Sequence, residues 1–140
     1  MPVNRISIET GVKVLEKIVP LEQVETVRLD MDRLGALQRQ FGDRSAEDIL
    51  CRATEELAVR LSDCERFWRQ HDWASLRKTV RSLGPMAEPI GMTGLARVAR
   101  DVTETLDAGD MVAAGATLFR LVRVGERSLT AVWDQQDLSV

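Results

Sequence analysis

The side chains of clearest chemical interest lie in the segment 73–91, WASLRKTVRSLGPMAEPIG. On a helix, most of its charged and turn-forming residues fall on one face or directly beside it: Arg77, Lys78, Arg81, Gly84, Pro85 and Glu88. Guanidinium groups form strong, often bidentate, hydrogen bonds with carboxylates. The set therefore predicts a docking surface for a partner, and the alternative interpretation is a solvated helix face.

Nucleophilic chemistry has only one candidate residue here. His71 is the sole histidine, and a neutral imidazole can accept a phosphoryl group near pH 7. It falls at the end of a predicted helix, ten residues before Arg81, so we interpret it as a loop or capping residue, with a relocated phosphoacceptor as the alternative. No glycine-rich phosphate loop and no distinctive carboxylate pair is present. We expect no enzyme activity, no metal site and no cofactor.

Apolar residues recur at helical spacing in five segments, and these must position the charged surface. Asp30 is the expected N-cap of the first helix, which Gly42 ends, although a start near Leu21 is an alternative. The second runs over 45–70, and the third begins after Asp72 and is broken or kinked at Gly84-Pro85. The fourth starts near Thr93 and ends at Ala108-Gly109, and the last runs from Asp110 to about Asp134. Their inward stripes predict a shared core of Leu57, Leu61, Leu76, Val80, Val98, Val102, Leu118 and Leu121.

The short connections between these helices force sequential helices to lie antiparallel. We therefore predict an all-α fold, an up-down antiparallel four-helix bundle with an extra N-terminal helix or arm. Residues 1–20 are assigned to the arm, either loosely docked or a short hairpin, because Ile6, Ile8, Val12 and Val14 alternate around Thr10-Gly11. Residues 21–140 are assigned to the bundle.

Composition excludes several classes of function. The 140 residues are 44% hydrophobic and 29% charged, with a net charge of −3, which argues against a nucleic-acid binder. No apolar run reaches the roughly 20 residues of a membrane helix, and no secretory signal is evident, so we expect a cytoplasmic protein. Cys51 and Cys64 lie 13 residues apart on one predicted helix, too far for a disulfide, and both are expected to be buried.

The segment 73–91 resembles the active helix of histidine-containing phosphotransfer (HPt) domains, whose pattern is close to A-H-[ST]-L-K-G-[SA]-A. Laid on it without gaps, Arg81 takes the place of the phosphorylated histidine, and Ser82 and Leu83 match. The lysine and glycine of the pattern fall on Gly84 and Pro85. The resemblance extends over about 29–133, through the Asp72-Trp73 helix start and the Ala108-Gly109-Asp110 turn.

The resemblance implies a four-helix bundle in a phosphorelay. Arginine stays protonated and cannot replace the histidine as an acceptor, so the implied role is non-catalytic. The expected partner is the receiver domain of a response regulator or a histidine kinase, and the acidic pocket of a receiver suits the guanidinium of Arg81. The alternative function is a scaffold or dimerisation protein that kept the fold without a phosphorelay role.

Overall fold

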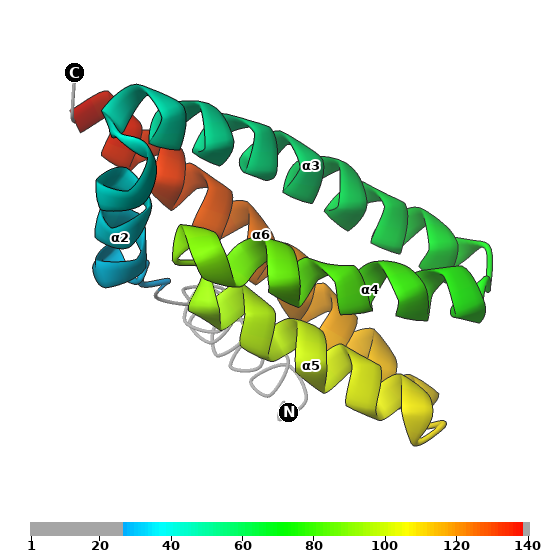
Figure 1. The fold of residues 1–140 in the computed structure, drawn as a ribbon. Helices are drawn as coiled ribbons and strands as arrows, with labels where there is room; N and C mark the ends of the chain where they lie inside the picture. Colours follow the sequence, from blue (N-terminus) through cyan, green and yellow to red (C-terminus); the bar gives the residue numbers. More distant parts are fainter. Residues whose placement is uncertain (1–26, 139–140) are drawn as a thin grey trace, which may run out of the picture.

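The computed structural model describes residues 27–138, and all regular structure in that range is helical (Figure 1). The elements are α2 (Met31–Phe41), α3 (Asp43–Arg69), α4 (Trp73–Ala87), the 3₁₀ turn η1 (Glu88–Ile90), α5 (Thr93–Asp107) and α6 (Met111–Leu138). The all-α prediction is confirmed over this range. The predicted N-terminal arm, with its possible hairpin, lies outside the described residues.

The four longer helices pack side by side with alternating direction, and α2 crosses one end of them (Figure 1). Each of α3, α4 and α5 packs against the helix that follows it, and α3 also contacts α6. The protein is therefore a helical bundle with antiparallel neighbours. No helix within 27–138 is both long and apolar enough to cross a membrane.

Aspartate side chains form the N-caps of three helices. The Oδ1 of Asp30 accepts hydrogen bonds from the backbone N–H groups of Asp32 and Arg33, and Asp72 accepts one from Ser75 at 3.1 Å. Asp110 caps α6 in the same way. Each cap satisfies amide groups that the first helical turn leaves unpaired. The predicted starts of α2, α4 and α6 are thus confirmed.

The start of α3 differs from the prediction. The helix begins at Asp43, directly after Gly42, instead of at Ser45. Gly42 ends α2 and precedes α3 with a φ of 81°, a left-handed conformation that a side chain would strain. A single residue therefore joins α2 to α3 and lets α2 cross the end of the bundle (Figure 1).

The core lies where the apolar stripes of α3, α4, α5 and α6 meet. All eight predicted core residues are buried, with exposed fractions of 5% or less: Leu57, Leu61, Leu76, Val80, Val98, Val102, Leu118 and Leu121. Cys64 joins them, but Cys51 is exposed, so the expectation of two buried thiols is wrong for Cys51. Cys51 lies on the exposed face of α3, between the partly buried Leu50 and Ala53.

Helix α4 continues through Pro85 to Ala87, so the break predicted at Gly84-Pro85 is not observed. A proline clashes with the Cβ of the residue before it when that residue is helical, and Gly84 has no Cβ. The 3₁₀ turn η1 follows α4 and ends at Gly91 with a φ of 83°. Gly91 accepts a 2.8 Å hydrogen bond from the amide of Asp30, which fixes the start of α2 against this turn.

Candidate docking groove

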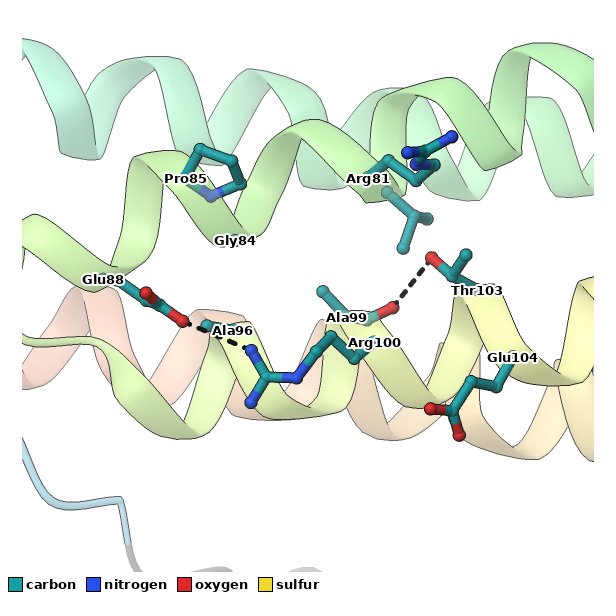
Figure 2. Close-up of a pocket in the computed structure, with 10 residues that line it drawn as sticks. Arg81, Gly84, Pro85, Glu88, Ala96, Ala99, Arg100, Thr103 and Glu104 are labelled. Carbon is teal, nitrogen blue, oxygen red and sulfur yellow. Dashed lines mark hydrogen bonds and ion pairs between the residues drawn. The ribbon is translucent and has the colours of Figure 1, made fainter.

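A groove of about 620 Å³ runs between α4 and α5 (Figure 2). Half of its lining comes from α4 and the start of η1 and half from α5: Val80, Arg81, Gly84 and Pro85 from α4, Glu88 from η1, and Ala96, Ala99, Arg100, Thr103 and Glu104 from α5. The two helices are antiparallel and separated only by η1 and a short turn, so the groove is built from residues close in sequence.

Small apolar residues form the floor of this groove. Val80, Ala96 and Ala99 are buried, with exposed fractions of 3% or less. Thr103 turns its hydroxyl back to the carbonyl oxygen of Ala99 at 3.1 Å, which leaves its methyl group for the groove. The short floor side chains leave room between the helices for a partner's side chains. Charged residues stand only at the rim.

Arg81 stands at this rim from α4. Its neighbour Val80 is fully buried, and one residue of helical rotation brings Arg81 to the exposed edge, as the sequence predicts. Its guanidinium makes no ion pair or side-chain hydrogen bond with any residue in 27–138. Its carbonyl oxygen also lacks the usual i+4 donor, because position 85 is proline and has no N–H. Arg81 therefore places at the rim of the groove a cation that forms no ion pair with the described chain, although its charge acts on Asp107.

Arg77 lies one turn before Arg81 but is held by its own chain. Its guanidinium donates two hydrogen bonds to Asp107 at the end of α5, from Nε to Oδ1 and from Nη2 to Oδ2 at 3.0 Å. This hydrogen bonding holds the pKa of Asp107 below its ordinary value, and the charges of Arg77 and Arg81 act in the same direction. The same contact raises the pKa of Arg77. Arg77 thus links α4 to α5 instead of lining the groove.

A second ion pair crosses the other end of the groove. Nη1 of Arg100 lies 3.2 Å from Oε1 of Glu88, and Figure 2 shows the contact joining the two walls. Both side chains keep much of their surface in solvent, so the pair adds at most a modest amount of stability. The charges at this end of the groove are therefore balanced within the chain.

The structure brings together four of the six residues predicted for the docking surface. Arg81, Gly84, Pro85 and Glu88 line the groove. Arg77 pairs with Asp107, and the exposed Lys78 lies outside the lining. The lining residues on α5 were not predicted from the sequence. Their signal is a stripe at the edge of the core stripe of α5, in which each residue has another three or four positions away: Ala96, Ala99, Arg100, Thr103 and Glu104.

His71 lies away from this groove, in the turn between α3 and α4. Its φ of 57° is left-handed, and its ring stacks on Trp73 with centroids 5.3 Å apart. Trp73 in turn meets Trp68 edge-on at 5.2 Å. His71 therefore packs in an aromatic cluster at the end of the bundle, consistent with a turn residue.

Within the described range, no group of three or more His, Cys, Asp or Glu side chains is arranged to hold a metal ion. Comparison of the chain with protein-family models, with curated proteins and with solved structures gave no match. The groove and the residues of α4 are therefore the features that indicate a function.

Proposed function

We propose that this protein is a non-catalytic, HPt-like signalling module that binds a receiver domain or a histidine kinase through the α4–α5 groove. It modulates a phosphorelay without carrying phosphate. The observation that carries the proposal is Arg81: an exposed cation without a partner in the described chain, at the position that the resemblance gives to the phosphorylated histidine.

The groove supports this assignment in two ways. Gly84 and Pro85 on its α4 wall keep apolar surface in solvent, and burial of that surface favours association. Its unneutralised guanidinium suits the carboxylates of an acidic partner surface. The antiparallel bundle supplies the scaffold that the resemblance requires.

The chemistry of α4 supports a non-catalytic role. Transfer of a phosphoryl group to this helix requires a nucleophile with a free lone pair, and the guanidinium of Arg81 has none at neutral pH. His71 is stacked on Trp73 at the end of the bundle and does not line the groove. We expect no radiolabel on the protein after incubation with a phosphorylated receiver. Acid-labile, base-stable label that disappears in His71→Ala would contradict this.

The docking proposal is tested by titrating candidate receiver and kinase domains against wild type, Arg81→Ala and Arg81→Lys by calorimetry. Truncating one member of an interfacial charge pair costs about 2–5 kcal/mol, so Arg81→Ala should weaken binding about 30-fold or more. Arg81→Lys keeps the charge but loses the bidentate geometry and should fall between the two.

Arg52→Ala is the matched control, because Arg52 is an exposed arginine on α3, outside the groove. It should bind like wild type. Equal affinity of wild type and Arg81→Ala would remove Arg81 from the interface. Absence of binding to every receiver and kinase of the host would favour the scaffold function instead.

A further inference from the structure

The two walls of the groove carry opposite charges at matching heights. Arg77 on α4 pairs with Asp107 at the end of α5, and Glu88, which begins η1 directly after α4, pairs with Arg100 on α5. The two pairs join the antiparallel helices at two different heights, and the Glu88–Arg100 pair lies beside Ala96 of the groove floor (Figure 2). From α4 into η1 the sign of the charge changes from positive to negative, and along the facing part of α5 it changes in the opposite sense.

A third pair of opposite charges lies between these two but remains open. Arg81 is one turn after Arg77 on α4, and Glu104 is one turn before Asp107 on α5. Both side chains line the groove from opposite walls, and Figure 2 shows them at the same end of it. They form no ion pair with each other, and Glu104, like Arg81, has none with any described residue. This is a cation and an anion on one face, each available to a partner.

We propose that the α4–α5 face binds the same face of a second copy of this chain, about a two-fold axis that runs along the groove. Such an axis lays α4 of one copy over α5 of the other. Arg81 of each copy then meets Glu104 of its partner, so the open pair is closed twice. A two-fold interface requires a self-complementary surface, and these walls provide one.

Packing geometry agrees with the charges. Rotation about an axis parallel to the helices keeps their directions, so α4 of one copy lies antiparallel to α5 of the other. The four helices form a square of antiparallel neighbours around the small floor residues Val80, Ala96 and Ala99. Short side chains at the centre allow close approach of the two helix pairs.

Self-association has a consequence for the docking function, and this part alone rests on that proposal. The dimer covers Arg81, so a receiver or kinase competes with the second copy for the same face. Dimerisation itself does not depend on any such partner. The groove then changes from a self-paired to a docking-competent state as the concentration of the chain falls.

The test uses charge exchange, with the mass in solution measured by sedimentation velocity over about 1–500 µM protein. Wild type should approach twice the monomer mass of 15.7 kDa as concentration rises. Arg81→Glu and Glu104→Arg each place like charges opposite one another at two symmetric positions, and each should weaken the dimer about tenfold or more. The double variant Arg81→Glu/Glu104→Arg should restore it.

Mixing provides the sharpest measurement. The Arg81→Glu chain has an acidic residue on both walls, at positions 81 and 104, and the Glu104→Arg chain has a basic residue at both. Each variant alone should be monomeric, and an equimolar mixture of the two should form a heterodimer. Arg52→Glu, the same charge reversal on an exposed site of α3, should dimerise like wild type. Raising the salt from about 50 to 500 mM should weaken the wild-type dimer.

The inference is overturned by a wild type that keeps the monomer mass at every concentration. It is also overturned by single reversals that dimerise like wild type, or by a mixture that stays monomeric. A monomeric wild type that binds a receiver through Arg81 would reject self-association and leave the docking function standing. A dimer that binds no receiver or kinase would do the reverse.

Discussion

Helix α6 packs closely on α3 at Gly125. The change in the free energy of unfolding caused by Gly125→Ala tests this close contact. A Cβ built at Gly125 would overlap Cδ1 of Leu61 and lie 3.1 Å from its Cδ2. Leu61 is only 4% exposed, so its side chain has little room to move away. In an open helix, alanine would be favoured over glycine by about 1 kcal/mol. Overpacking of a filled core costs about 1–3 kcal/mol, so the net effect should be a loss of about 1 kcal/mol.

The matched control is Gly94→Ala in the first turn of α5. A Cβ there meets no atom within 4 Å, so only the backbone term acts. We expect Gly94→Ala to stabilise the protein by about 0.5–1 kcal/mol. Urea denaturation followed by far-ultraviolet circular dichroism gives both free energies of unfolding. The opposite signs of the two Gly→Ala changes are the expected result.

A double-mutant cycle identifies Leu61 as the cause. Leu61→Ala alone should cost about 2–5 kcal/mol, because it removes buried methyl groups and leaves a cavity. In that background the methyl group of Gly125→Ala has space, so the second substitution should become neutral or stabilising. The coupling free energy should then be about 1–3 kcal/mol. Additive effects, or a Gly125→Ala protein as stable as Gly94→Ala, would refute the close contact of α3 with α6.

Two further outcomes test the core. Leu76→Ala should cost about 2–5 kcal/mol in urea denaturation, because Leu76 is fully buried among α3, α4 and α5, and an unchanged midpoint would contradict its place there. Burial raises the pKa of the Cys64 thiol to about 12, so one thiol, that of Cys51, should react with Ellman's reagent in native protein at pH 8, and two should react in guanidinium chloride. Because the unfolded thiol ionises near its ordinary pKa of 9.0, Cys64 favours folding below pH 9 and loses this contribution as the pH rises toward 12. Two reactive thiols in the native state would place Cys64 outside the core.

Much of the fold was predictable because local signals and tertiary packing agree. The Asp30, Asp72 and Asp110 caps act through hydrogen bonds within one helical turn, so the chain around each is sufficient to predict it. The core residues follow from 3.6-residue periodicity because every helix buries a single stripe. The start of α3 shows the limit, since Gly42 with its positive φ lets the helix begin at Asp43, two residues before the predicted start at residue 45.

The candidate site was only half predictable because it lies between two helices. Periodicity places Arg81 at the edge of the buried stripe of α4, but it does not say which neighbour faces that edge. The contribution of α5 requires the register set by the Glu88–Arg100 pair. The predicted break in α4 is absent because the effect of Pro85 on the helix depends on the residue before it. Gly84 has no Cβ, so the usual clash between the proline ring and that Cβ does not occur.

Arg77 and Arg81 show why residue type and spacing do not define a docking surface. Both are arginines on one face of α4, and the sequence gives them the same interpretation. The end of α5 brings Asp107 against Arg77, and this long-range contact converts that arginine from a free cation into a link between helices. One turn later the facing residue is Glu104, which lines the opposite wall without pairing with Arg81. The exposed chemistry of the groove is therefore set by which acidic residue of α5 lies within reach of each arginine, and Arg81 is the one that forms no ion pair within the described range.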